Sequence, residues 1–143
     1  MVLAFTWLGS VTAQAQGTQG SAIVGTWHVQ VFLDPGHTQL LFESYKQWHS
    51  DGLEFESANI GPGVLCVGTW QAMGHTVARL YHVGWTYGSP VGTTRFVWTE
   101  TETVGPDGNS YDGSGQIVYY DENGNQVGDP VPTYPHATRL PTH

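Results

Sequence analysis

The stretch VGTWHVQVFL, residues 24–33, is the part of the sequence that most directly indicates the fold. Its large apolar residues recur at every second position: Trp27, Val29, Val31 and Leu33. Because neighbouring side chains of a β-strand point to opposite faces, this spacing predicts a strand with one face toward a core. The next three residues, Asp34-Pro35-Gly36, are typical turn formers and end the segment.

The chain after Ala22 repeats this pattern, with β-branched and aromatic runs between turns rich in Gly, Pro, Asn and Asp, and shows no convincing helical periodicity. Asp51-Gly52 and residues 122–125 are typical hairpin turns. The further predicted strands are 38–49, 53–58, 64–73, 75–87, 93–104, 116–121 and a short one near 136–140.

These strands start about every 10 to 12 residues, which leaves no room for crossover helices between them. An antiparallel meander of that length must hide its edges by closing or by folding over itself. We therefore expect an all-β protein: a single antiparallel up-and-down β-barrel of about eight strands. A two-sheet sandwich or jelly roll is the alternative.

Size and charge exclude several classes of partner. The chain has 143 residues, enough for one domain, and carries a formal net charge of -8 with only 11% charged residues. Nucleic acids and anionic membranes bind to basic patches, so we expect neither as a partner. The single cysteine, Cys66, excludes an intrachain disulfide and a zinc site built from several cysteines, and we interpret it as a small buried apolar residue.

The N-terminal residues 1–15, MVLAFTWLGSVTAQA, combine a short apolar run with a small-x-small ending. This pattern predicts a signal peptide and a secreted or periplasmic protein. We expect no membrane insertion, because a transmembrane helix needs about 20 apolar residues. Residues 16–21 then form a polar linker to a barrel domain over 22–143. Alternatively, the N-terminal segment is retained as a strand or helix packed on the barrel.

Residues 23–27, IVGTW, resemble the Gly-x-Trp signature that opens the first strand of lipocalins and other calycin-like barrels. In that family the tryptophan plugs the closed end and an arginine from a late strand packs across it, which the resemblance assigns to Trp27 and Arg139. The chain is also similar, over residues 22–140, to secreted bacterial calycin-like proteins with no general assigned activity. The shared features are Asp51-Gly52, Gly68-Thr69-Trp70 and the turn at 121–125. The lipocalin disulfide and the helix before the last strand are missing.

A barrel of this size is either filled by side chains or holds one small ligand. The alternating faces of residues 77–85 and 96–102 carry more aromatic bulk than a small core requires, and aromatic walls with a few polar groups are typical of ligand sites. We therefore expect a small hydrophobic or aromatic molecule as partner, with solid aromatic packing as the alternative. The predicted ligand-binding residues are Trp27, Arg79, Tyr81, Trp85, Phe96, Trp98 and Arg139.

Possible acid–base groups lie on the same strands. Glu100 and Glu102 share a face with Trp98, and burial beside an indole would raise the pKa of a carboxyl group, as a general acid requires. The alternative is that residues 99–103 form a solvated strand end. Histidine transfers protons near neutral pH, so the predicted catalytic residues are Glu100, His82 and His49. No two histidines have a chelating spacing, and we expect no metal site and no cofactor.

Three classes of function remain open on this evidence. The first is a secreted lipocalin-like barrel, monomeric or a homodimer, that binds a small hydrophobic molecule. The second is a cofactor-independent cyclase, isomerase or lyase that uses a buried His or Glu. The third is a homopolymer, a filament whose subunits add their N-terminal segment as a strand to a neighbour. A small barrel can serve each of these functions, so the fold alone does not select one.

Overall fold

The computed structural model describes residues 20–61 and 63–142. Within these ranges no helix is long and apolar enough to cross a membrane. The predicted signal peptide and most of the predicted linker, with the filament hypothesis that depends on them, lie outside the described residues. The strands are β1 (Gly25–Phe32), β2 (Leu40–Trp48), β3 (Leu53–Ala58), β4 (Leu65–Ala72), β5 (Val77–Trp85), β6 (Arg95–Val104), β7 (Ser110–Tyr120) and β8 (Gln126–Arg139).

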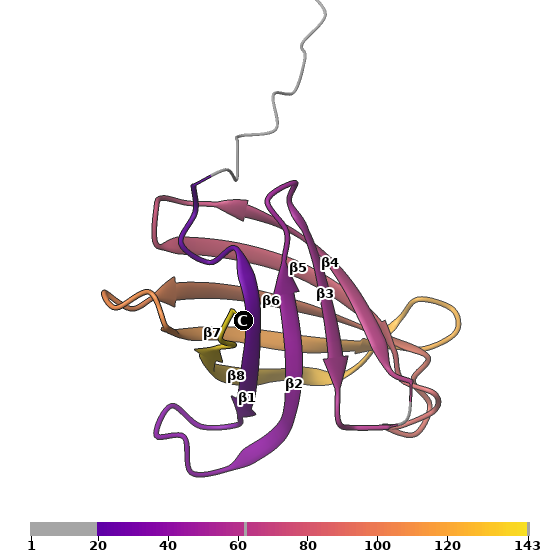
Figure 1. Cartoon of the computed structure of the whole chain (residues 1–143). Helices are drawn as coiled ribbons and strands as arrows, with labels where there is room; N and C mark the ends of the chain where they lie inside the picture. The colour runs from indigo at the N-terminus through magenta and orange to yellow at the C-terminus, as the bar shows by residue number, and fades with distance from the viewer. Residues whose placement is uncertain (1–19, 62, 143) are drawn as a thin grey trace, which may run out of the picture.

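The strands form one closed barrel. Each strand pairs antiparallel with the next, and β8 returns to pair with β1, from Trp27 opposite Arg139 to Phe32 opposite Tyr134 (Figure 1). The predicted all-β, up-and-down barrel is therefore confirmed, and the sandwich and jelly-roll alternatives are excluded.

Strands β7 and β8 are both longer than the sequence predicted. Strand β8 continues through three prolines. Pro130 and Pro132 lie in the half of β8 that pairs with β7 alone, since the pairing with β1 reaches only as far as Tyr134. A proline is tolerated where a strand has a free side, because its missing N–H is not required there for a ladder hydrogen bond. The proline-rich end is thus part of the sheet.

The inward side chains divide the interior into three layers: an apolar layer at the open end, a charged middle layer and a tryptophan-rich base. The inward residues of β2 are Phe42, Ser44, Lys46 and Trp48, and those of β6 are Phe96, Trp98, Glu100, Glu102 and Val104. The predicted inner face of β6 is confirmed. On β2 the inward face is the one that buries Lys46.

On β5 the predicted inner face is wrong. Ala78, Leu80 and His82 point inward, whereas Arg79 is exposed and Tyr81 is 53% exposed. The register with β6 explains this, because it places Tyr81 opposite the outward Thr99. Two strands that pair in a barrel must share their inner and outer faces, so the inward face of β6 fixes that of β5. On the first strand the inward Trp27, Val29 and Val31 are confirmed, but Leu33 lies beyond the end of β1 and is exposed.

The base of the barrel is closed by Trp27 and Arg139. Trp27 is fully buried, and the guanidinium carbon of Arg139 lies 4.0 Å from the centre of its ring. Arg139 also donates hydrogen bonds to the carbonyl oxygens of Gly108 (2.7 Å), Val24 (2.9 Å) and Ala22 (2.6 Å). The pairing that the resemblance implied is confirmed, and one arginine ties the first strand to the last strand and to the β6–β7 turn.

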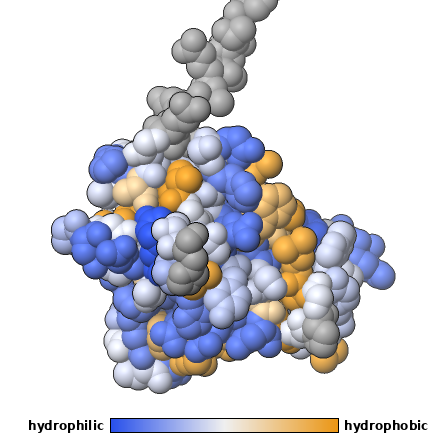
Figure 2. All heavy atoms as spheres, in the orientation of Figure 1, coloured by the Kyte–Doolittle hydropathy of each residue, from blue (hydrophilic) through white to orange (hydrophobic). Residues whose placement is uncertain are grey.

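The outer surface carries apolar residues as well as polar ones. Figure 2 shows patches of hydrophobic residues between hydrophilic ones on one face of the barrel. The large apolar residues that are more than half exposed are Ile60, Leu65, Met73, Trp85, Tyr87 and Val91, together with Tyr45 and Tyr81. Five of these lie in or beside the β3–β4 and β5–β6 connections at the open end of the barrel: Ile60, Leu65, Trp85, Tyr87 and Val91.

Replacing Arg139 with alanine removes its three hydrogen bonds and its contact with Trp27. Hydrogen bonds from a charged donor contribute about 1.5–3 kcal/mol each, so we expect the free energy of unfolding to fall by at least about 3 kcal/mol. Urea denaturation measures it. The matched control is Arg79→Ala on the outer face, for which a change within about 0.5 kcal/mol is expected. Equal effects of the two substitutions would show that Arg139 does not hold the base.

Candidate functional site

A cavity of about 520 Å³ lies at the open end of the barrel. It is bounded by the ends of β2, β3, β4, β5, β6 and β7 and by the β3–β4 and β5–β6 connections. Its volume falls in the range of about 300–1,000 Å³ that is usual for small-molecule sites. The aromatic residues of its wall are Phe42, Trp85, Tyr87, Phe96, Trp98 and Tyr119.

The cavity wall also holds a few polar groups. Glu56 and Cys66 lie in it on neighbouring strands, and Thr86 lies near the opening. The hydroxyl oxygen of Thr86 is buried and has no hydrogen-bond partner among the described residues. Buried polar atoms are nearly always bonded, so this hydroxyl is available to a bound molecule.

Next to the cavity, toward the base, lies a buried ion cluster. We use this name for six residues, each at most 2% exposed: Lys46, Glu54, Glu56, His82, Glu100 and Glu102. Each buried ion carries a desolvation cost of several kcal/mol that contacts with opposite charges only partly offset. Such clusters are weak evidence for stability and occur often at functional sites. Glu56 belongs both to this cluster and to the cavity wall.

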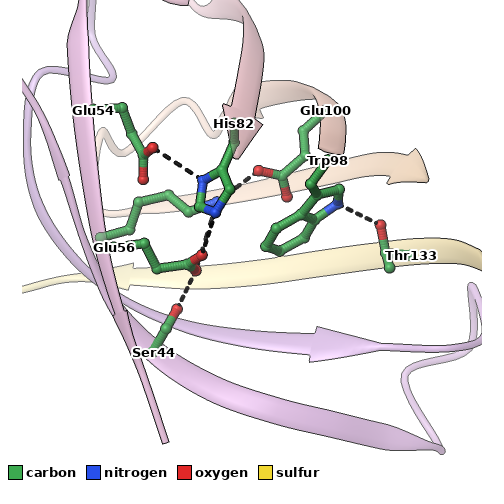
Figure 3. Close-up of polar contacts among 8 residues, drawn as sticks. Ser44, Glu54, Glu56, His82, Trp98, Glu100 and Thr133 are labelled. Carbon is green, nitrogen blue, oxygen red and sulfur yellow. Dashed lines mark hydrogen bonds and ion pairs between the residues drawn. The ribbon is translucent and has the colours of Figure 1, made fainter. Parts of the chain in front are cut away.

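His82 is held between two carboxylates (Figure 3). Its Nδ1 lies 3.0 Å from Oε2 of Glu54, and its Nε2 lies 3.3 Å from Oε2 of Glu56. Burial by itself lowers the pKa of His82, but its contacts with Cys66 and Glu54 and the charges of Glu56 and Glu54 outweigh this and raise the pKa to about 10. The imidazole is therefore protonated at neutral pH.

Lys46 supplies the second positive charge. Its Nζ lies 2.6 Å from Oε2 of Glu100, 3.8 Å from Oε1 of Glu56 and 4.4 Å from the centre of the Trp98 ring. Burial lowers the pKa of Lys46, but the charges of Glu100 and Glu56 outweigh it and hold the pKa well above its usual value. Ser44 completes this side of the cluster by donating a 2.5 Å hydrogen bond to Oε1 of Glu56.

The buried ion cluster contains more carboxyl groups than cations, so one carboxyl group, that of Glu102, has no cation to pair with. Burial raises the pKa of Glu102 well above its usual value, and the nearby charge of Glu100 raises it further. Burial also raises the pKa of Glu100, although Lys46 opposes this. Because a hydrogen bond between the carboxyl groups of Glu102 and Glu100 requires a proton on one of them, and the pKa of Glu102 is raised the more clearly, we assign the protonated carboxyl to Glu102. The alternative that residues 99–103 are a solvated strand end is wrong for both glutamates.

Glycines on the neighbouring strand make room for these carboxyl groups. Gly113 and Gly115 of β7 pair with Glu102 and Glu100, and a Cβ atom at Gly113 would overlap the carboxyl group of Glu102. A Cβ atom at Gly115 would collide with the backbone of β6. The alternating glycines of residues 113–115 are therefore the sequence signal that indicates large inward groups on β6. No comparable signal predicts the burial of Lys46 or Glu56.

The predicted ligand-binding residues fall into three groups. Phe96 and Trp98 line the cavity, and Trp85 lies at its rim, where it is 61% exposed. Arg79 and Tyr81 lie outside the barrel and do not contribute to the cavity wall, since the inner face of β5 was assigned wrongly. Trp27 and Arg139 close the base, as described above, and do not reach the cavity either.

Two of the three predicted catalytic residues belong to the buried ion cluster. His82 contacts Glu54 in this cluster, and Glu100 contacts Lys46. Among the members of the cluster, Glu56 lines the cavity, whereas His82 and Glu100 do not. His49 lies apart from them. It is exposed just after β2, where its ring packs against Phe55, because the chain turns at Asp51-Gly52 outside the barrel.

Comparison with known proteins does not identify a relative. No protein-family model matches the chain, and no curated protein and no solved structure matches it significantly. The closed eight-stranded barrel is consistent with a calycin-like fold.

The shifted pKa values predict how stability depends on pH. The unfolded chain releases the proton of Glu102 near pH 4.5 and that of His82 near pH 6.5, whereas the folded protein holds both to higher pH. Each contribution is complete below the unfolded pKa and is lost as the pH rises through the folded one. We therefore expect the free energy of unfolding to decrease between pH 5 and about pH 10, as measured by urea denaturation at several pH values.

Two substitutions separate the contributions to this pH dependence. Glu102→Gln keeps the shape of a neutral side chain, so it should flatten the pH dependence that begins near pH 4.5. The exposed Glu122 serves as control, because Glu122→Gln should leave the curve unchanged. Stability that increases with pH between pH 5 and 10 would contradict the assigned protonation states.

Proposed function

We propose that this protein is a secreted, lipocalin-like barrel that binds a small, largely apolar molecule with an aromatic ring in its cavity. The observation that carries the proposal is the cavity itself: about 520 Å³, open at one end and walled by aromatic side chains. Burial of apolar surface is the main source of affinity in such sites.

The distribution of polar groups supports one orientation of the ligand. The inner end of the cavity holds the carboxylate of Glu56, whereas the entrance is rimmed by the exposed aromatic residues Trp85 and Tyr87. A ligand with a hydrogen-bond donor at one end would place that group near Glu56 and its ring among the aromatic side chains. The free hydroxyl of Thr86 offers one further contact near the entrance.

The wall opposite Glu56 is fixed in position. The Nε1 atom of Trp98 donates a 2.9 Å hydrogen bond to the hydroxyl of Thr133. The indole ring also makes edge-to-face contacts with the rings of Phe42 and His82. A preorganised wall loses little entropy on binding, which favours affinity. Trp98 is fully buried, so its removal would test folding more than binding.

Filling the cavity is a sharper test. Ala58 lines the cavity and is buried, so Ala58→Trp should occupy the ligand space. The probe is N-phenyl-1-naphthylamine, an apolar aromatic dye that fluoresces in apolar sites. We expect one dye molecule to bind per chain, and Ala58→Trp to weaken binding by at least about tenfold, or about 1.4 kcal/mol.

The matched control places the same side chain outside the barrel. Val67 lies on the outer face of β4 and is 45% exposed, so Val67→Trp should change the affinity for the dye by less than about twofold. Absence of dye binding to the natural chain, or equal effects of the two substitutions, would contradict a ligand site in the cavity.

A second candidate function, proton-transfer catalysis, is favoured by one observation. Glu56 reaches the cavity while its two oxygens contact Ser44, Lys46 and His82 inside the buried ion cluster. A carboxylate so placed can remove a proton from a carbon atom of a bound molecule, and a nearby protonated group can return one. This corresponds to an isomerase, cyclase or lyase without a cofactor.

Exchange of hydrogen for deuterium distinguishes catalysis from simple binding. Molecules that displace the dye are incubated with the protein in deuterated water, and their C–H signals are followed by NMR. If Glu56 is a base, one C–H signal of the molecule disappears with the natural protein and persists with the Glu56→Gln variant. The same molecule should still displace the dye from this variant. Persistence of every C–H signal with the natural protein would leave binding as the sole function of the cavity.

A further inference from the structure

Three side chains of different donor type meet at the floor of the cavity: Glu56 on β3, Cys66 on β4 and His82 on β5. All three are buried, and their potential ligand atoms lie within 4.8 Å of one another. Ligands of a tetrahedral zinc ion, at about 2.0–2.3 Å from the metal, are about 3.3–3.8 Å apart. A tetrahedral site requires the three ligand atoms, which lie on adjacent strands, to come within that spacing.

The orientation of His82 is the one found in metal sites. Its Nδ1 is held by the carboxylate of Glu54 at 3.0 Å, which directs Nε2 toward Glu56. Nε2 lies 3.3 Å from Oε2 of Glu56 without hydrogen-bonding geometry, and the thiol of Cys66 is a further contact of the ring. Metal-ligating histidines usually bind a carboxylate through the other ring nitrogen in this way, and that contact fixes the ring.

The two oxygens of Glu56 have separate contacts. Oε1 accepts the hydrogen bond of Ser44 and lies 3.8 Å from Nζ of Lys46, whereas Oε2 faces Nε2 of His82. A carboxylate whose one oxygen is fixed by neighbouring donors can present the other oxygen to an ion. Glu56 is thus oriented from one side and open on the other.

Space and access are present at the same point. Gly84 lies beside Cys66, and a Cβ atom there would lie 2.6 Å from the ring of Phe96 and 2.8 Å from the sulfur atom, so glycine lets both side chains pack at this point. Glu56 and Cys66 both line the cavity, which gives an ion a path from solvent. Three protein ligands leave a fourth position for water or a bound molecule.

We propose that Glu56, Cys66 and His82 form a binding site for a divalent transition-metal ion, with Zn²⁺ as the expected occupant. Thiolate and imidazole ligands favour zinc over calcium or magnesium, which prefer oxygen ligands. On binding, the ion takes the place of the thiol proton of Cys66 and the Nε2 proton of His82, and both protons pass to solvent. The site does not depend on the proposed apolar ligand, whose binding the dye measures separately.

Cobalt(II) provides a spectroscopic test of this site. The chain is freed of metal with a chelator and titrated with Co²⁺, which gives a thiolate-to-cobalt charge-transfer band only when a cysteine is a ligand. We expect the band to saturate at one ion per chain and to disappear when Zn²⁺ displaces Co²⁺. Absence of the band would overturn the proposal, since Cys66 is the single cysteine of the chain.

Variants assign the ligands. Cys66→Ser should abolish the band and weaken Zn²⁺ binding by at least about 100-fold, and Glu54→Gln should weaken it by about 10- to 100-fold while keeping the band. Circular dichroism and urea denaturation show whether each variant is folded, and Cys66→Ala replaces Cys66→Ser if the latter is not. Unchanged affinity for Zn²⁺ in a folded Cys66 variant would overturn the proposal.

A second group of potential ligands provides the control. His37, Asp112 and His136 also lie close together, but on the surface, where His136 already contacts Asp112 at 2.7 Å. His136→Gln should leave both the band and the affinity for Zn²⁺ unchanged. Loss of the tight Zn²⁺ site in this variant, with retention in Cys66→Ser, would assign the ion to the surface and overturn the proposal.

Discussion

The mutual contact of opposite charges inside the barrel is the constraint on which the rest of the interior depends. Lys46 and His82 are each placed between carboxylates, and all of these groups are removed from water. Loss of any one partner would leave a buried charge without compensation, at a cost of about 3–5 kcal/mol. The positions of β2, β3, β5 and β6 relative to one another are therefore linked through side chains as well as through backbone hydrogen bonds.

This charged layer lies between the two ends of the barrel, which are packed differently. Toward the base, edge-to-face contacts join Trp27, Trp48, Trp70 and Tyr111, and Arg139 covers the ring of Trp27. Toward the opening, the interior is not filled, and the cavity begins where Glu56, Cys66 and Trp98 end the packed region. A hydrophobic middle layer of similar volume would often be at least as stable as buried ion pairs, which favours a functional reason for the charges.

The sequence predicts the barrel well because closure follows from local features. Alternation in residues 24–33, 53–58 and 96–102, with turn residues between strands, indicates both the strands and their antiparallel order. The Gly-x-Trp motif also predicts the contact of Trp27 with Arg139, although the two residues are far apart in the chain.

The side chains that face the interior are harder to predict, because several of them are polar or charged and would be expected on the outer surface. On β5 the bulky Tyr81 and Trp85 suggest the inner face, yet register with β6 turns His82 and Gly84 inward. Lysine side chains are usually solvent-exposed. The burial of Lys46 is possible because β3 and β6 contribute its acidic partners. The cluster of Glu56, Cys66 and His82 joins three strands, so no spacing along the chain reveals it.

The protonation state of His82 tests the central claim, that paired charges form the middle of the barrel, most directly. In metal-free protein labelled with ¹⁵N, two-dimensional NMR of the imidazole rings reports whether each ring nitrogen carries a proton, and His82→Gln assigns the signal. With a pKa of about 10, His82 should show both nitrogens protonated at pH 8. A neutral ring at that pH would contradict the charge network and with it the account of the barrel interior.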